Sequence, residues 1–156
     1  MINIKIFNER EKKDVEKILF QQFGIDSVPG KIIMRGQERL FLFSGDFTEK
    51  EIEELEKIAF IERMGIYFAK ISEKEGIRLS IEGSQILKDQ IKKNIFELDD
   101  SDAEQWMMGR ELAIKTGIRG FLIIKNKNDF LGTGKASEEK IGNFIPKNRR
   151  LRERQQ

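Results

Sequence analysis

The chain of 156 residues contains no cysteine and no histidine. Without cysteine it can form no disulfide, no thiolate zinc site and no cysteine nucleophile. Without histidine it has no imidazole ligand for a metal and no imidazole base for a catalytic triad. Acid–base catalysis would depend on its 27 Asp and Glu residues, and no spacing among them selects a pair. We therefore predict a protein that is not an enzyme and that holds neither a cofactor nor a metal.

Long apolar segments are also missing. No stretch approaches the roughly 18 uninterrupted apolar residues of a membrane-spanning helix, and residues 1–5 lack the charged and then apolar pattern of a signal peptide. The lack of cysteine fits a reducing compartment. We expect a soluble, cytoplasmic protein with no membrane partner.

Charged residues make up 36% of the chain, and they are unevenly placed. From Lys135 onward there are seven Lys and Arg against three Glu, a net charge of +4. The preceding 134 residues carry 22 basic and 24 acidic side chains, a net charge of −2. A basic end attracts polyanions, because phosphate contacts dominate the affinity of proteins for nucleic acid.

This basic end has two interpretations. It can be a frayed, solvated terminus that only aids solubility, or it can contact a polyanion. Lys147 and Arg149 follow directly from an apolar segment that ends at Pro146, so their stems start from a fixed scaffold. Arginine also supplies planar forks suited to phosphate. Both observations favour contact with a polyanion.

The first part of the chain predicts a strand and a capped helix. Residues 2–6 alternate isoleucine with polar side chains, as in a half-buried strand. Asn8 is expected to cap a helix, with Glu11 closing a capping box and Gly24 ending it. The apolar stripe of this helix consists of Val15, Ile18, Leu19 and Phe23.

A hairpin and a second helix are expected next. Residues 31–34 and 40–43 are apolar runs on either side of a polar turn at residues 35–38. Thr48 and Glu51 then have the spacing of a second capping box.

Two further strands precede a change of pattern. Residues 66–71 form an apolar run, and residues 77–82 alternate apolar and polar side chains. The pattern loosens afterwards, and a seam is expected near residues 88–93. We predict an N-terminal α/β lobe at 1–90 and a second domain at 91–156, packed against each other.

The second domain predicts a short helix and several short strands. Asp99 is expected to cap the helix, after an apolar segment at residues 95–98. Four short apolar segments follow, with glycines between or within them: residues 112–114, 121–124, 130–131 and 141–145. Many short strands with glycine corners are typical of a small barrel, since closure removes exposed edges.

Motif-like segments elsewhere fail on their context. Residues 129–136 have the second glycine and the lysine of a phosphate-binding loop, but lack its first glycine and its Ser or Thr. The GxxG at residues 117–120 precedes a predicted strand instead of joining two helices. The acidic residues at 99–104 complement the dipole of a helix N-terminus, which explains them without a metal.

Two aromatic sites have open alternatives. Trp106 could stack on a base, but its helical spacing with Ala103 and Met107 favours a core position. Tyr67 and Phe68 could also stack on bases, although their apolar neighbours favour a buried strand.

Several segments resemble a PUA domain, namely residues 102–112 (DAEQWMMGREL), 120–123 (GFLI), 130–136 (FLGTGKA) and 143–150 (NFIPKNRR). They are similar to the PUA-like domain that ends Nop/Fmu-type RNA cytosine-C5 methyltransferases, and to small archaeal stand-alone proteins of that ribosome biogenesis family. Residues 77–85 (IRLSIEGSQ) resemble the preceding "pre-PUA" lobe. The implied fold class is α+β, with a mixed pre-PUA lobe packed on a small PUA-like pseudobarrel that carries a short helix.

The resemblance implies binding of structured rRNA or tRNA in ribosome biogenesis or RNA modification. The methyltransferases carry a cofactor-binding domain and catalytic cysteines, which this sequence lacks, so a targeting role without catalysis is expected. The alternative is an accessory subunit that docks on an RNA methyltransferase or a ribosomal protein. The charge pattern and the resemblance, which includes a glycine turn at residues 132–135, place these residues near the RNA: Arg110, Gly132, Gly134, Lys135, Lys140, Lys147, Arg149, Arg150 and Arg152.

Overall fold

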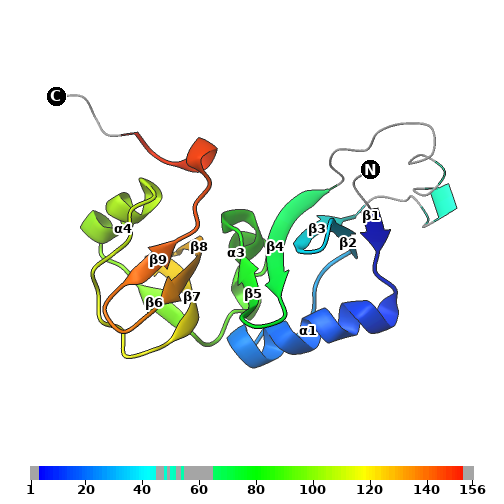
Figure 1. The fold of residues 1–156 in the computed structure, drawn as a ribbon, viewed down its shortest axis with the longest axis horizontal. Helices are drawn as coiled ribbons and strands as arrows, with labels where there is room; N and C mark the ends of the chain where they lie inside the picture. Colours follow the sequence, from blue (N-terminus) through cyan, green and yellow to red (C-terminus); the bar gives the residue numbers. More distant parts are fainter. Residues whose placement is uncertain (1–3, 45–47, 49, 52–53, 55–64, 153–156) are drawn as a thin grey trace.

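A computed structural model describes residues 4–44, 48, 50–51, 54 and 65–152 of the chain. Two lobes lie side by side, one built on a five-stranded sheet and the other on a four-stranded sheet (Figure 1). The fold class is α+β, as predicted. In the part described, no helix is both long and apolar enough to cross a membrane.

The N-terminal lobe contains β1 (Ile4–Ile6), α1 (Glu9–Phe23), β2 (Lys31–Arg35), β3 (Arg39–Phe43), β4 (Ile66–Ser72), β5 (Gly76–Leu79) and α3 (Ile81–Ile86). After a 3-10 turn at Lys88–Gln90, the C-terminal lobe contains β6 (Ile95–Glu97), α4 (Asp100–Met107), β7 (Gly120–Asn126), β8 (Asp129–Ala136), β9 (Ile141–Asn143) and the 3-10 turn η2 (Lys147–Arg149).

Helix α1 begins and ends as the sequence predicts. The Asn8 side chain accepts a hydrogen bond from the Glu11 backbone N–H at 2.9 Å, and the Glu11 carboxylate accepts one from the Asn8 N–H at 3.2 Å. Gly24 ends the helix with a positive φ of 76°. The helix runs along the five-stranded sheet (Figure 1) and buries the residues Val15, Leu19 and Phe23 in the core.

Strands β1 to β5 form an antiparallel meander in chain order, and the predicted hairpin is β2–β3. Most of the predicted second helix falls outside the described residues. Its cap is described in part, because the Thr48 hydroxyl accepts a hydrogen bond from the Glu51 N–H at 3.2 Å, as the capping pattern requires.

The strand expected over residues 77–82 is shorter than predicted. It ends at Leu79, and Ser80 caps α3 by accepting a hydrogen bond from the Gly83 N–H at 2.9 Å. Ile81 belongs to the first turn of α3, where it is buried. The alternation of polar and apolar residues therefore continues past the end of the strand, because the polar cap Ser80 and the apolar Ile81 happen to follow the same order as strand residues.

Helix α3 is held directly against β4. That strand carries one extra residue, Phe68, because Leu40 pairs with Ala69 while the next pair is Phe41 with Tyr67. The extra Phe68 leaves its carbonyl free to accept a hydrogen bond from the Ser80 N–H at 2.8 Å. A side chain at Gly83 would place its Cβ 2.1 Å from this carbonyl oxygen, so only glycine allows this contact.

Buried hydroxyl groups join the two lobes. The Thr133 hydroxyl on β8 accepts a hydrogen bond from the Leu79 N–H at 2.8 Å, and the Ser84 hydroxyl on α3 accepts one from the Gly132 N–H at 3.0 Å. Both side chains are almost completely buried. Ile123 of the C-terminal lobe also belongs to the core cluster of the N-terminal lobe, so the lobes share a packed interface.

The C-terminal sheet has the order β6-β7-β8-β9, with β6 parallel to β7 and the other pairs antiparallel. Backbone pairing among the described strands does not close it into a barrel, and the arrangement is compatible with a pseudobarrel. The predicted segment at residues 112–114 forms a single bridge, between Leu112 and Ile141. Trp106 is fully buried, and its indole N–H donates to the Leu131 carbonyl at 3.0 Å. Its predicted core position is confirmed.

The first testable prediction concerns the contact of α3 with β4. Replacing Gly83→Ala should lower the free energy of unfolding by about 1–3 kcal/mol or more, because the new methyl group overlaps a backbone carbonyl that cannot move alone. Urea denaturation followed by circular dichroism measures this change.

Gly142→Ala is the matched control. Its added Cβ would lie 3.6 Å from the nearest atom, an ordinary contact. The control should leave the free energy of unfolding unchanged or raise it by up to about 1 kcal/mol. Equal stabilities of the two variants would contradict the close packing of α3 on β4.

Candidate functional site

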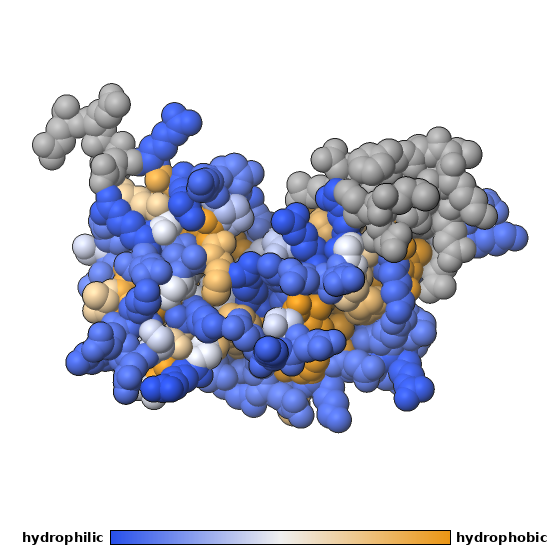
Figure 2. Space-filling model, in the orientation of Figure 1, coloured by the Kyte–Doolittle hydropathy of each residue, from blue (hydrophilic) through white to orange (hydrophobic). Residues whose placement is uncertain are grey.

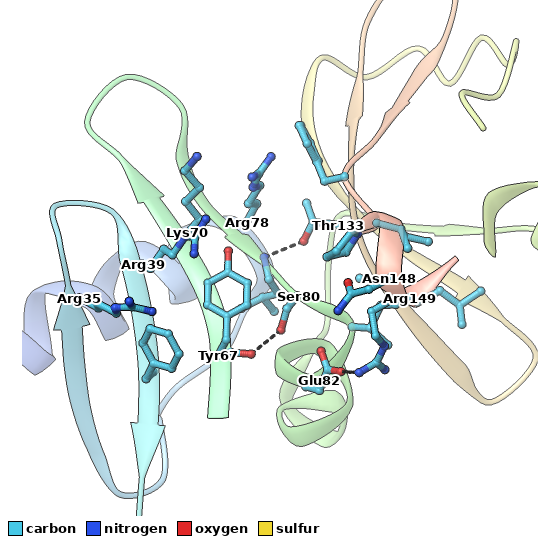
Figure 3. A pocket seen from close by; sticks show the side chains of 18 residues that line it. Arg35, Arg39, Tyr67, Lys70, Arg78, Ser80, Glu82, Thr133, Asn148 and Arg149 are labelled. Carbon is cyan, nitrogen blue, oxygen red and sulfur yellow. Dashed lines mark hydrogen bonds and ion pairs between the residues drawn. The ribbon is translucent and has the colours of Figure 1, made fainter. Parts of the chain in front are cut away.

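A cleft of about 680 Å³ lies between the two lobes. Figure 2 shows the surface hollowed there, with hydrophilic side chains on both sides of the hollow. One wall comes from strands β2 to β5, and the other comes from β8 and residues 144–149. Helix α3 contributes its first residues between them (Figure 3).

Four cations cross the wall of the N-terminal lobe in register. Arg35 pairs with Arg39, Arg39 with Lys70, and Lys70 with Arg78, on the neighbouring strands β2, β3, β4 and β5. Directly opposed residues of a sheet point to the same face, and all four line the cleft (Figure 3). At about 4.8 Å between strands, this cation row extends for about 14 Å.

The cation row is poorly neutralised. Like charges that face each other across strands destabilise a sheet. Lys70 has an ion pair with Glu38 at 2.9 Å. Within the described part of the chain, Arg35, Arg39 and Arg78 have no salt bridge. Among the described residues the three arginines therefore face the cleft without a salt bridge, while the charge of Arg78 contributes to lowering the pKa of the Glu75 carboxyl.

Aromatic rings accompany these charges. The Arg78 guanidinium carbon lies 3.9 Å from the centroid of the Phe144 ring, a cation–π contact that spans the two lobes. On the wall of the N-terminal lobe, Tyr67 packs against Phe41 with ring centroids 5.6 Å apart. Of the two aromatic residues left open by the sequence, Tyr67 lines the cleft and Phe68 is fully buried.

The glycines predicted near the RNA, Gly132 and Gly134, lie within β8. Residues 132–135 lie in the middle of β8 and do not form a turn, which corrects the expectation from sequence. Gly132 lines the cleft, but its N–H already donates to Ser84. Gly134 is covered by the core, because a Cβ there would lie 2.8 Å from the Trp106 ring.

Of the basic residues predicted in the C-terminal segment, only Arg149 lines the cleft. There it forms an ion pair with Glu82. The Arg150 side chain donates from Nε to the Ile145 carbonyl at 3.0 Å. Lys147 and Arg152 are exposed nearby and do not line the cleft.

The other predicted cations lie outside the cleft and have partners. Lys135 forms a 2.5 Å ion pair with Glu75, and this hydrogen bond lowers the pKa of the Glu75 carboxyl below its usual value. Lys140 pairs with Glu111 at 2.8 Å. Arg110 donates a hydrogen bond to the Gln105 side chain.

Sequence reasoning missed the cation row. Arg35 and Arg39 close the predicted hairpin on either side of its turn, so the hairpin register alone would have paired them. Lys70 and Arg78 each sit among apolar residues of predicted strands. Placing them in the same row needs the strand order and the extra residue in β4.

Residues 93–151 match the family model of the methyltransferase RsmF PUA domain. The chain is 27% identical over 140 residues to the ribosomal RNA small subunit methyltransferase F of Shewanella oneidensis, covering 88% of this chain and 28% of the relative. Its counterparts in Vibrio parahaemolyticus and Aeromonas salmonicida are 26% and 28% identical, each match covering 90% of this chain and 29% of the relative. The chain thus spans less than a third of the length of these curated relatives. The predicted resemblance is confirmed.

The second testable prediction concerns the loss of folding stability caused by repulsion within the cation row. Replacing Arg39→Gln removes the charge between two like charges, so it should leave the free energy of unfolding unchanged or raise it by about 0.2–1 kcal/mol. The gain should shrink in 1 M salt, where the Debye length falls to about 3 Å. Urea denaturation at low and high salt measures both effects.

Lys127→Gln provides the opposite case. Lys127 forms an exposed ion pair with Asp100 at 3.1 Å, so its replacement should lower the free energy of unfolding by up to about 1 kcal/mol. A loss of stability in Arg39→Gln at low salt, as large as that of Lys127→Gln, would show that the row is not under charge repulsion.

Proposed function

We propose that this chain binds structured RNA in the cleft between its lobes. The observation that carries the proposal is the cation row, in which three of the four cations have no salt bridge among the described residues, and which faces a hollow together with Arg149. Such a strip suits a polyanion, since phosphate contacts supply most of the affinity for nucleic acid. The match of residues 93–151 to a PUA domain of an rRNA methyltransferase family supports RNA as the polyanion.

Within this proposal the chain binds RNA and does not modify it. Glu82 is the only carboxylate among the described residues that line the cleft, and it is paired with Arg149. No second carboxylate is placed to share proton transfer with it there. The segment also matches less than a third of the length of the methyltransferases, consistent with a role in holding RNA.

The names of the relatives suggest the kind of RNA. They are ribosomal RNA small subunit methyltransferases, so we propose rRNA as the first choice and tRNA as the second, in ribosome biogenesis or RNA modification. A partner such as an RNA methyltransferase or a ribosomal protein belongs to the same proposal. In the competing form, the chain is an accessory subunit whose cations contact an acidic protein surface.

The third testable prediction concerns the cation row as a phosphate site. We expect the triple variant Arg35→Gln, Arg39→Gln and Arg78→Gln to lose most of its affinity for a fluorescently labelled rRNA hairpin, measured by anisotropy against salt concentration. With five cations in the cleft, the slope of log K against log salt should be about −3.5 to −4.5 for the wild type. With two cations left, it should fall to about −1.4 to −1.8.

A second triple variant serves as the control, because its net charge equals that of the first triple variant. Arg10, Lys13 and Lys17 are exposed on α1, which covers the opposite face of the sheet. Their replacement by Gln removes the same three charges, yet should leave the affinity and the slope close to those of the wild type. Equal losses in both triple variants would mean that only net charge matters and would overturn the cleft as the site.

The accessory-subunit alternative has its own measurement. It requires a protein partner that stays bound after nuclease treatment and is released by the triple variant of the cation row. If RNA binding survives the replacement of the row by Gln, the RNA site would instead lie in the basic segment predicted from the sequence, which contains Lys147, Arg149, Arg150 and Arg152.

A further inference from the structure

The geometry of the cleft points to a site for one unpaired nucleotide, and we propose that the chain recognises a base that is turned out of the RNA helix. This inference rests on the proposed function and adds the structural class of RNA that the cleft accepts. It is carried by the size of the cleft, by a stacking surface inside it, and by polar groups on both walls that have no hydrogen-bond partner among the described residues.

The size of the cleft suits a nucleotide. Its volume of about 680 Å³ lies within the roughly 300–1,000 Å³ that hold small organic ligands. The cation row runs for about 14 Å along one wall, which is long enough to contact the phosphates on either side of such a nucleotide. A paired base remains inside its own helix and cannot enter a hollow of this kind.

Arg78 supplies a stacking surface for the base. Its guanidinium carbon lies 3.9 Å from the centroid of the Phe144 ring, which itself meets the edge of Phe121 with an interplanar angle of 79°. The contact holds the guanidinium in place before any ligand arrives. Planar guanidinium groups and aromatic rings are the surfaces on which unpaired bases stack in RNA-binding proteins.

Two polar groups are available to contact a stacked base. The Tyr67 hydroxyl and the Asn148 amide have no hydrogen-bond partner within the described residues, and both line the cleft. They come from opposite walls, Tyr67 from β4 and Asn148 from η2 (Figure 3). An amide and a hydroxyl can donate to and accept from the edge of a base, whereas phosphates need only the cations.

The fourth testable prediction compares two RNA probes. One is a fully paired RNA hairpin, and the other is the same hairpin with one unpaired adenosine in its stem. We expect the wild-type protein to bind the bulged hairpin about ten-fold more tightly. A fluorescent adenine analogue at the bulge should lose fluorescence on binding, because stacking quenches it.

Arg78→Lys separates stacking from charge. It keeps the positive charge but removes the planar surface, so it should reduce the preference for the bulged hairpin to about two-fold or less while the fully paired hairpin stays bound. Arg39→Lys is the matched variant, since among the described residues Arg39 makes no cation–π contact with an aromatic ring. It should change the affinity for both hairpins by the same factor.

The outcomes distinguish this inference from the proposed function. Equal binding of the two hairpins, with both weakened in the triple variant of the cation row, would overturn the unpaired-nucleotide site and leave RNA binding in the cleft. A bulge preference that is unchanged in Arg78→Lys would also overturn it. If the triple variant of the cation row binds both hairpins as tightly as the wild type does, the proposed function itself fails.

Discussion

Two buried hydrogen bonds link α3 and β5 to β8 across the interface between the lobes, where the cleft opens. Ser84 and Thr133 are buried hydroxyls, and each accepts a backbone N–H of the opposite lobe. Such buried bonds are costly to break, because the freed donor is left without a partner. Together with the apolar contacts of Ile123 and Phe130 in the core of the N-terminal lobe, they hold the two walls of the cleft in place.

The rigid frame explains how the cation row can exist. Three arginines and a lysine on adjacent strands repel one another, and a flexible surface would relieve that repulsion by moving. Here the strands are held by α1 on one face and by α3 at the end of β5, so the charges remain aligned. Packing of the core offsets this repulsion, and the proposed polyanion would relieve it.

The sequence predicts local structure well where one short segment contains all the information. The capping box of α1 needs only Asn8 and Glu11, and the hairpin needs only its turn. The candidate site could not be predicted in this way. Lys135 and Arg150 belong to the densest charge in the sequence, yet they bind Glu75 and a backbone carbonyl. Arg39 and Arg78 are distant in the sequence and become neighbours of Lys70 only through the strand order and the extra residue Phe68.

Both lobes line the cleft, whereas the family model matches only the C-terminal part of the chain. The PUA model covers residues 93–151, which include Phe144 and Asn148 but no member of the cation row. Arg78 reaches Phe144 from outside that segment, so the proposed stacking surface has one half in each lobe. A PUA domain alone would lack the cation row, and the N-terminal lobe alone would lack the ring that holds Arg78. The similarity to the methyltransferases extends over about nine-tenths of this chain and therefore includes both lobes.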